Sequence, residues 1–298
     1  MSDNVSYKKC LFVINPISGD LNKEELAAKI ETFFDDNSKE IKILYTTGKD
    51  DDSQIKKYLE EFKPHIVVAV GGDGTVNLVA KHLIHKDIIM GILPMGSGNG
   101  LSKDLGIPQN NPDKVLEMLK NPKVIEMDTL TANNHFFLHL ADIGFNAHIV
   151  RLFSKGKKRG LISYIKYTVK EFYKYKTSRY TVDSDYGRFE GRAFMITIAN
   201  SNQFGSNLTI NPNGKYDDGL FEVIIIKRFP RSESFRLFFQ LLFKKIIFSP
   251  YCIILRCKEV QISSTRKKTV QIDGEIAGRF DKVKVDINPN SLKVIAPE

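Results

Sequence analysis

The first 130 residues alternate short apolar runs with segments whose apolar residues recur at helical spacing. The runs are rich in β-branched residues, and such near-continuous apolar strands are typical of a parallel sheet covered by helices on both faces. The predicted strands cover residues 10–15, 41–46, 65–70 and 88–93, and the predicted helices cover 24–34, 53–62 and 75–84. The pattern therefore predicts a three-layer α/β domain over residues 1–128.

After residue 128 the pattern changes to short strands separated by turns. Many short strands at close spacing predict a β-sandwich or a partly closed barrel. We therefore expect a β-rich second domain over residues 129–298, with a last strand that can return to the first domain. The predicted strands cover 129–132, 135–143, 192–199, 219–226, 251–257, 259–263, 269–273, 282–287 and 292–296, with loops at 183–191 and 211–219.

Two helical segments of unusual composition interrupt these strands. Residues 161–173 place apolar side chains beside a row of lysines, which predicts a basic amphipathic helix. Residues 235–248 read FRLFFQLLFKKIIF and are too short to span a bilayer, which takes about 20 apolar residues. We expect most of this second segment to be buried, and a helix on a membrane surface is the alternative.

Composition and charge narrow the class of protein. The chain has 298 residues, 42% of them hydrophobic and 27% charged, which excludes disordered, collagen-like and coiled-coil chains. Its three cysteines fit neither an even disulfide set nor a CxxC metal site, and no secretory signal is visible at the start. We therefore expect buried thiols and a cytoplasmic protein.

The basic charge is local. The net charge is +9, and residues 151–180 alone hold ten Lys and Arg against one Glu, so the rest of the chain is neutral on balance. Such a patch indicates an anionic partner, for which anionic lipid headgroups and nucleic acid both fit. A merely solvated helix face is the alternative.

Three glycine-rich loops follow predicted strands of the first domain. They read NPISG at 15–19, GGDGT at 71–75 and GSGNG at 96–100. Glycines let backbone N–H groups approach an anion, and a helix starting near Thr75 directs its positive end at the same space. A tight turn explains any one loop, but three together predict a phosphate site. No Walker P-loop motif is present, and the dinucleotide fingerprint is only weakly supported.

Acidic residues mark three further spots. Asp73 lies inside a glycine loop, where a carboxylate beside phosphates calls for Mg²⁺ between them, although a helix cap is the alternative. Asp273 and Glu275 follow a strand, and a two-residue period would put both on one face, as base chemistry requires; an exposed acidic hairpin is the alternative. Asp217 and Asp218 resemble a turn that leads into a strand.

Taken in order, the motifs NPISG, GGDGT, GSGNG, DDGL and IDGE resemble those of the diacylglycerol kinase catalytic-domain family, especially its soluble bacterial lipid kinases, which are related to sphingosine and ceramide kinases. The resemblance spans nearly the whole chain. It implies an α/β nucleotide-binding domain similar to phosphofructokinase and NAD kinase, followed by a β-sandwich. It also implies a kinase that uses ATP and Mg²⁺ to phosphorylate a hydroxyl of a diacylglycerol-like or sphingoid lipid.

The resemblance also assigns residues. Glu275 falls where bacterial members have the proton acceptor, with Asp273 beside it; sphingosine kinases use an aspartate of the glycine loop, here Asp73, but Mg²⁺ would make Asp73 a poor base. The side chain of Asp218 and the carbonyls of Lys215 and Leu220 fall on the family's Mg²⁺ site. ATP would be held by Asn15, Pro16, Ile17, Ser18, Gly19, Thr46, Gly71, Gly72, Asp73, Gly74, Thr75, Val76, Asn77 and Ser97.

The expected partners are a lipid substrate and, peripherally, an anionic membrane surface, which residues 155–176 and the exposed part of 235–248 would contact. Nucleic acid is not expected, and a homodimer is compatible with the sequence. The third loop reads GSGNG where bacterial members usually read GTxND, so the acceptor lipid stays open. The alternatives are an NAD kinase-like phosphotransferase with a soluble acceptor and a non-catalytic protein that binds lipid or nucleotide.

Overall fold

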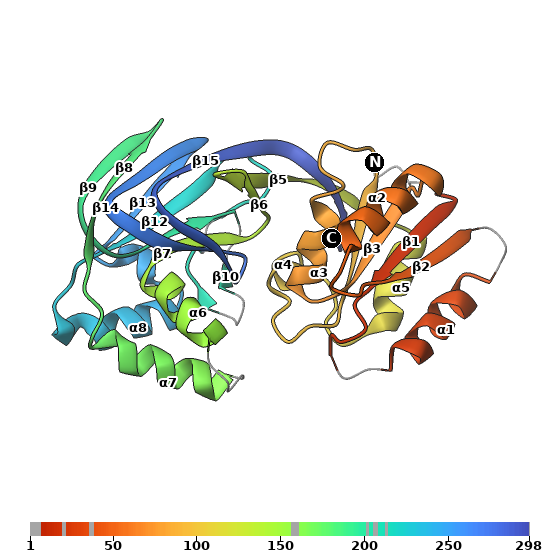
Figure 1. Cartoon of the computed structure of the whole chain (residues 1–298), viewed down its shortest axis with the longest axis horizontal. Coiled ribbons are helices and arrows are strands. Elements are labelled where there is room, and N and C mark those ends of the chain that lie inside the picture. Colours follow the sequence, from red (N-terminus) through yellow and green to blue (C-terminus); the bar gives the residue numbers. More distant parts are fainter. Residues whose placement is uncertain are drawn as a thin grey trace. The chain divides into compact units, whose positions relative to one another are not determined.

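The structure is a computed structural model that describes residues 7–19, 22–35, 39–155, 161–200, 203–204, 208–211 and 214–297 (Figure 1). It divides into two compact units, which are described separately. The first unit comprises Met1–Met127 and Asn290–Glu298, and the second comprises Asp128–Pro289.

The first unit is a parallel sheet with helices on both faces. Its strands run in the order β15, β4, β3, β1, β2, and each neighbouring pair is parallel. They are β1 (Lys9–Ile14), β2 (Glu40–Tyr45), β3 (Ile66–Gly71), β4 (Ile89–Pro94) and the end of β15 (Glu275–Ile295). The helices are α1 (Lys23–Phe33), α2 (Asp51–Glu61), α3 (Asp73–Ala80), α4 (Gly100–Asp104) and α5 (Pro112–Lys120). The predicted α/β arrangement is confirmed, and α4 and α5 are additions to it.

The layers of this unit follow from its sequence. Every residue of β3 and β4 is buried, as expected of continuous apolar strands in the middle of a covered sheet. Figure 1 shows α1 and α5 on one face and α2 and α3 on the other. An ion pair between Lys29 and Asp113 joins α1 and α5, and a hydrogen bond of 2.7 Å between His82 and Asp52 joins the chain after α3 to α2.

The second unit is β-rich, as predicted. Its strands are β5 (Val124–Ala132), β6 (His135–Phe137), β7 (Leu140–Gly144), β8 (Ser178–Ser184), β9 (Gly187–Ala199), β10 (Gln203–Phe204), β11 (Leu208–Thr209), β12 (Phe221–Lys227), β13 (Cys252–Cys257), β14 (Glu259–Ile272) and most of β15. Both β9 and β14 pair with β8 along one half and with β7 along the other. The sheet therefore bends around an apolar core that draws on most of these strands, and a second, smaller apolar cluster includes residues of β12 and α8.

Three strand predictions need correction. Residues 259–263 and 269–272 belong to one strand, because β14 continues through a register shift between Ser263 and Lys268. Residues 282–287 and 292–296 likewise belong largely to β15. The predicted loop at 183–191 is wrong, because β8 and β9 form a hairpin there, with Asp183 opposite Arg188 and Phe189 packed on the core. Its alternating polar side chains face solvent, so the segment reads as a loop.

Helices α6 (Phe145–Lys155), α7 (Leu161–Phe172) and α8 (Ser234–Leu242) belong to the second unit, with the 3₁₀ turns η1 (Arg231–Glu233) and η2 (Ile246–Phe248) on either side of α8. The helix predicted at 161–173 is present as α7, whereas residues 156–160 and the side chains of 155 and 161–166 lie outside the described residues. Burial of most of 235–248 was a wrong expectation, since in α8 and η2 only Leu237 and Ile246 are buried.

Two smaller expectations concern the membrane and the cysteines. No helix in the described part of the chain has the length and apolar character needed to cross a membrane. All three cysteines are free, with Cys10 and Cys257 buried and Cys252 partly so. Buried thiols are therefore confirmed for two of the three positions.

Candidate active site

The three glycine loops follow neighbouring strands of the first unit. In the sheet, β1 lies beside β3 and β3 beside β4, with Ile14 in register with Val70 and Gly71 with Pro94. Because all three strands are parallel, their carboxyl ends meet at one edge of the sheet. The loops that the sequence separates by more than 20 residues are therefore side by side, where ligands of such sheets bind.

The loops touch through their backbones. A Cβ on Gly72 would lie 3.2 Å from the Cα of Gly96, and one on Gly19 would lie 2.3 Å from the carbonyl oxygen of Met95. The N–H of Met95 donates to the carbonyl of Gly71 at 2.8 Å. Glycine is thus required at these positions because one loop packs directly on the next, and no side chain could be inserted without moving backbone.

Asn15 fastens the first loop to the second. Its side-chain Nδ2 donates to the Thr75 hydroxyl at 3.3 Å, while its Oδ1 accepts the N–H of Ile17 at 3.1 Å. Thr46 continues the same edge on β2, since its N–H donates to the carbonyl of Ile14 at 2.9 Å. Ser97 is exposed in the third loop. The predicted ATP-binding residues are thus brought to one edge of the first unit.

Asp73 lies at the start of α3, between the second and third loops. The N-cap of α3 is Gly72, so Asp73 is the first helical residue and does not cap the helix. A Cβ on Gly98 would lie 3.0 Å from Oδ2 of Asp73, which puts this half-buried carboxylate against the third loop. The positive end of α3, with Val76 and Asn77 in its first turns, points to the same edge.

Asn99 is a residue of this site that the sequence analysis missed. Its backbone is left-handed, with φ +54°, and its Oδ1 accepts the N–H of Gly96 at 2.9 Å. Its Nδ2 donates to Oε1 of Gln109 at 3.1 Å. Asn99 therefore sets the shape of the third loop. An asparagine within a glycine run was the available signal, because it tolerates the left-handed region better than most residues do.

In the second unit, Asp273 and Gly274 form the two-residue turn between β14 and β15. Their φ angles are +46° and +89°, and Ile272 pairs with Glu275 across the turn. The expectation that Asp273 and Glu275 share one face of a strand is therefore wrong, because the chain reverses between them. Glu275 is exposed and Asp273 is half-buried, so the two carboxylates have different surroundings.

Asp273 binds the backbone where β6 connects to β7. Its carboxylate accepts the N–H groups of Leu138 at 3.0 Å, of His139 at 3.1 Å and of Leu140 at 2.8 Å. Its own N–H donates to the carbonyl of Leu140 at 2.8 Å. Asp273 thereby fixes the turn that precedes Glu275.

A buried carboxylate, that of Asp142, is connected to the same turn through the side chain of Gln271. Asp142 accepts hydrogen bonds from the Thr197 hydroxyl, from the Asn146 amide at 2.7 Å and from the Gln271 amide, and Gln271 in turn accepts the N–H of Gly274 at 2.7 Å. Complete burial raises the pKa of Asp142 to about 6, against the lowering effect of these hydrogen bonds. The pair of Asp142 and Gln271 was missed, although Gln271 directly precedes the IDGE motif.

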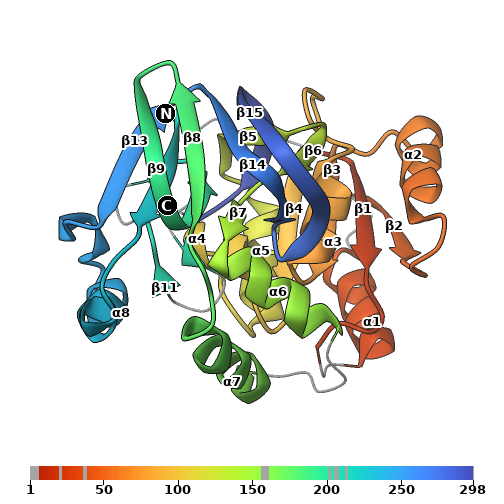
Figure 2. The same cartoon turned by 60° about the vertical axis from the view of Figure 1, so that its left-hand side comes forward.

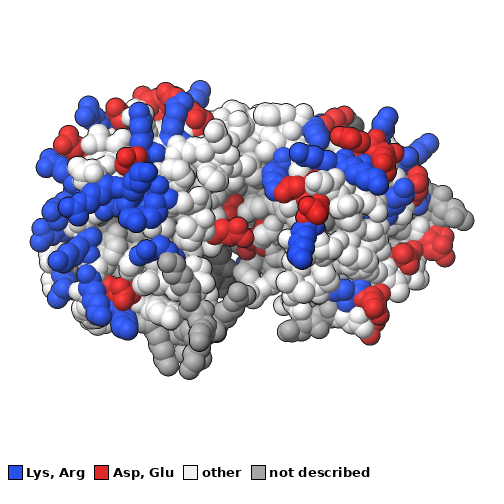
Figure 3. All heavy atoms as spheres, in the orientation of Figure 1, with Lys and Arg blue, Asp and Glu red and all other residues white. Residues whose placement is uncertain are grey.

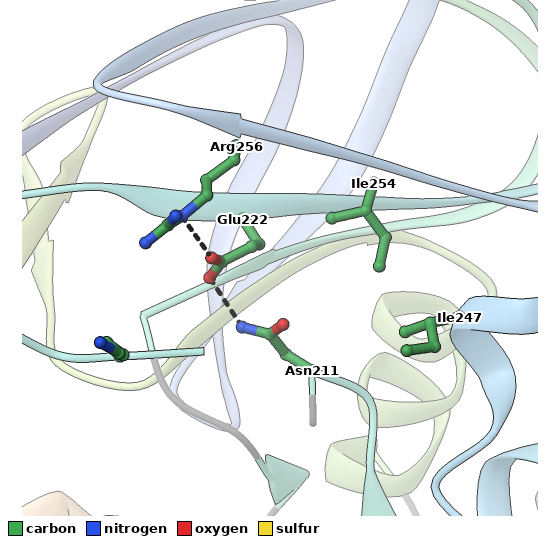
Figure 4. A pocket seen from close by; sticks show the side chains of 6 residues that line it. Asn211, Glu222, Ile247, Ile254 and Arg256 are labelled. Carbon is green, nitrogen blue, oxygen red and sulfur yellow. Dashed lines mark hydrogen bonds and ion pairs between the residues drawn. The ribbon is translucent and has the colours of Figure 1, made fainter. Parts of the chain in front are cut away.

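The predicted metal residues lie in another part of the second unit, beside a pocket that Asn211, Glu222 and Arg256 help to line (Figure 4). The carboxylate of Asp218 forms an ion pair with Arg256, whose Nε also lies 3.3 Å from Oε1 of Glu222. Oε2 of Glu222 accepts the Asn211 amide at 2.7 Å, and burial raises the pKa of Glu222. A cavity of about 310 Å³ is lined by Asn211, Glu222 and Arg256 together with Lys215, Ile247 and Ile254.

The hydrogen bonds and the ion pair of Asp218 decide whether its carboxylate is available to a cation. One oxygen of Asp218 is paired with Arg256, and the other accepts the N–H of Leu220 at 3.1 Å. A divalent cation would have to displace a guanidinium, so the donor set as it stands does not suit Mg²⁺. Among the described residues, no group of three His, Cys, Asp or Glu side chains is arranged to hold a metal ion. The metal role of Lys215, Asp218 and Leu220 stays a prediction.

Two domain families match the chain. The diacylglycerol kinase catalytic domain matches residues 9–132, and the YegS C-terminal NAD kinase beta sandwich-like domain matches residues 140–296.

Individual proteins agree with this result. A protein of Bacillus subtilis (strain 168) named diacylglycerol kinase is 25% identical over 279 residues, which cover 91% of each chain. A diacylglycerol kinase of Staphylococcus aureus (strain Newman) is 26% identical over 283 residues, covering 92% of this chain and 88% of the other. The crystal structure of a diacylglycerol kinase from Bacillus anthracis str. Sterne shares the fold, with a TM-score of 0.75 at 20% identity over 98% of both chains.

Proposed function

The chain belongs to the diacylglycerol kinase family, and on that premise we propose that it is a lipid kinase that transfers the γ-phosphoryl group of ATP to a lipid hydroxyl. The acceptor class is a diacylglycerol-like or sphingoid lipid. The expected peripheral contact with an anionic membrane surface belongs to the same proposal, because such an acceptor resides in a bilayer.

The convergence of three glycine loops at one sheet edge is the observation that carries this proposal. Backbone N–H groups at the loops and the positive end of α3 suit the phosphates of a nucleotide. Direct contact between Gly72 and Gly96 leaves no side chain between the second and third loops, so a phosphate chain can approach the backbone closely.

The proposed chemistry assigns three carboxylates. Glu275, exposed at the end of its turn, takes the proton of the acceptor hydroxyl, and Asp273 holds that turn in place. Asp73, the first residue of α3, would hold the Mg²⁺ that accompanies ATP as part of the co-substrate. Magnesium bound to the phosphates offsets negative charge that develops during phosphoryl transfer. No step is assigned to a cation at Asp218, because Arg256 occupies that carboxylate.

The test is Mg²⁺-dependent transfer of labelled phosphate from ATP to lipid in mixed micelles. Diacylglycerol, monoacylglycerol, sphingosine and ceramide are offered in parallel, with Glu275→Gln as the matched variant. We expect labelled lipid from the wild type and a loss of about 10²-fold or more in kcat for the variant, since a general base contributes at least that much. Because Glu275 is exposed, the variant should keep the melting temperature of the wild type.

Two results would overturn the proposal. Label on added NAD with none on lipid would indicate a phosphotransferase with a soluble acceptor. Tight ATP binding without release of ADP for any acceptor would indicate a binding protein. Full activity in Glu275→Gln together with loss in Asp73→Asn would move the role of the base to Asp73.

A further inference from the structure

Helix α8 and the turn η2, together with Phe243 between them, expose large apolar side chains to solvent. Six large apolar side chains are exposed, and we call them the aromatic face of α8: Phe235 (72%), Phe238 (53%), Phe239 (51%), Leu242 (43%), Phe243 (67%) and Phe248 (74%). On the opposite side of the helix, Leu237 is buried and Leu241 packs against the same core. The helix is therefore anchored by one face and presents a second apolar face to solvent.

Most of this face, from Phe235 to Phe243, lies along one side of α8. Phe235, Phe238, Phe239 and Leu242 follow helical spacing, so they share one side of α8. The ring of Phe239 stacks on that of Phe243 with centroids 6.3 Å apart, and Phe238 meets Phe239 edge-on at 5.9 Å. The rings contact one another rather than the core. Exposed apolar patches of this kind mark interaction sites in soluble proteins.

The surroundings of the aromatic face are strongly basic. Residues 227–250 contain six Lys and Arg and a single acid, Glu233, which is paired with Arg236 at 3.6 Å. Lys244 and Lys245 directly follow Phe243 and are exposed. Figure 3 shows Lys and Arg side chains gathered over the second unit. The aromatic face thus lies within a region of positive charge.

The end of α7 joins the same surface. The Arg231 guanidinium donates to the Tyr173 carbonyl at 2.8 Å and lies 5.9 Å from the centre of the Tyr173 ring. Tyr173 and Val169 are themselves 56% exposed, and Lys170 and Lys174 flank them. Both views of the ribbon place α7 and α8 at the same end of this unit (Figures 1 and 2). Aromatic and basic side chains therefore extend from α8 onto the end of α7.

Exposed aromatic rings flanked by Lys and Arg favour one kind of binding partner over another. A second copy of the chain, docked through the same face, would bring two sets of Arg231, Lys244 and Lys245 into one interface, where like charges repel. The surface of an anionic bilayer instead offers apolar depth for the rings and phosphates for the cations, as interfacial helices require. Rings of Phe with flanking Lys and Arg are the composition of such helices.

We propose that α8 is the membrane-docking element of this protein, lying in the plane of an anionic bilayer with its aromatic face among the acyl chains. Arg231, Arg236, Lys244 and Lys245 bind the phosphates of the lipid headgroups. Docking would give the proposed kinase access to its lipid acceptor, and only this purpose rests on the proposed function. Binding to the bilayer itself needs no turnover.

The test is sedimentation of the full-length chain with vesicles of phosphatidylcholine containing phosphatidylglycerol. Phe243→Gln and Tyr186→Gln form a matched pair, because the two rings are 67% and 66% exposed and Tyr186 lies far from α8 in the sequence, in the turn after β8. We expect the first variant to bind about tenfold more weakly and the second to bind like the wild type. A triple variant, Phe238→Gln/Phe239→Gln/Phe243→Gln, should abolish binding.

A second matched pair tests the charges. Lys244→Gln/Lys245→Gln should lose several-fold in affinity, and more at low salt, whereas Arg266→Gln/Lys267→Gln removes the same charge from exposed positions on β14 and should change little. Equal binding to vesicles of pure phosphatidylcholine would overturn the role of the cations. Equal binding of the folded triple variant and the wild type would overturn the proposal, as would a wild-type dimer that the triple variant converts to monomers.

Activity assays separate this inference from the proposed function. With a short-chain, water-dispersed diacylglycerol the triple variant should keep wild-type activity, and with vesicle-embedded acceptor it should lose it. A wild type without activity on either acceptor contradicts the proposed function but leaves the sedimentation result to judge α8. Loss of activity on both acceptors in a folded variant would show that α8 acts elsewhere than in docking.

Discussion

The two units hold their candidate catalytic groups in opposite ways. The glycine loops of the first unit are positioned by backbone packed on backbone, as at Gly72 and Gly96, with few side chains involved. The turn that carries Glu275 is positioned by side chains, through Asp273 on one side and the buried Asp142 and Gln271 on the other. The first arrangement is sensitive to atoms added where the backbones touch, and the second is sensitive to lost hydrogen bonds.

The largest expected effect comes from adding one carbon to the first arrangement. In Gly96→Ala the new Cβ would lie 2.6 Å from the Cα of Gly72 and 2.8 Å from Oδ1 of Asn99, so backbone must move. We expect a loss of about 2–3 kcal/mol in the free energy of unfolding and a loss of ATP affinity of about tenfold or more, because overpacking costs that much and the loop shifts. Thermal unfolding and calorimetric ATP titration measure both.

Gly74→Ala is the matched comparison for the stability part. Nothing lies within 4 Å of a Cβ at Gly74, which stands in α3, where alanine favours the helix. Its melting temperature should equal or exceed that of the wild type. Equal stability of the two variants would show that the loops do not depend on close backbone contact.

The next effect comes from removing an acceptor in the second arrangement. Asp273→Ala leaves three backbone N–H groups without their carboxylate and puts alanine at φ +46°. We expect a loss of about 2 kcal/mol in stability and a lower kcat with KM for ATP unchanged, because the turn under Glu275 loosens while the glycine loops stay intact. Asp273→Asn should restore part of the activity, since its amide oxygen can still accept. An unaltered kcat in Asp273→Ala would argue against positioning.

The pH dependence of Asp142 sharpens the comparison further. Its folded pKa of about 6 lies above the unfolded value of 3.8, so the folded state binds the extra proton. The stability that this group contributes is present below pH 3.8 and is lost as the pH rises to about 6, by about 3 kcal/mol in all. Relative to Asp142→Asn, which cannot titrate, the melting temperature of the wild type should therefore fall across this window. A constant difference between the two proteins would contradict the assignment.

The smallest expected effect concerns the ion pair at Asp218. Arg256→Gln frees this carboxylate, and because Arg256 is half-exposed the stability should change by about 1 kcal/mol or less. If Arg256 is what keeps a cation away, Mg²⁺ titrated by calorimetry without nucleotide should bind the variant more tightly than the wild type. Equal affinities would show that the guanidinium does not compete with a metal.

Much of the fold was predictable because its cause is local. Continuous apolar strands such as β3, alternating with helical patterns, identify a covered parallel sheet without reference to tertiary contacts. The hairpin end at 183–191 escaped prediction because most of its side chains are polar and, among these residues, only Phe189 packs on the core. Helix α8 was misjudged for the converse reason: composition reports that a segment is apolar but not which of its faces finds a partner.

The sequence by itself determined the class of both units, the three phosphate-type loops, and the motif order that indicates the family, because glycine runs and strand patterns act within a few residues. Only the tertiary structure decided that Gly72 packs on Gly96 and that Asp142 and Gln271 support the Glu275 turn. It alone also decided that Arg256 occupies Asp218 and that α8 presents its rings to solvent. These contacts join residues far apart in the chain, and a local sequence pattern does not predict which distant residues meet.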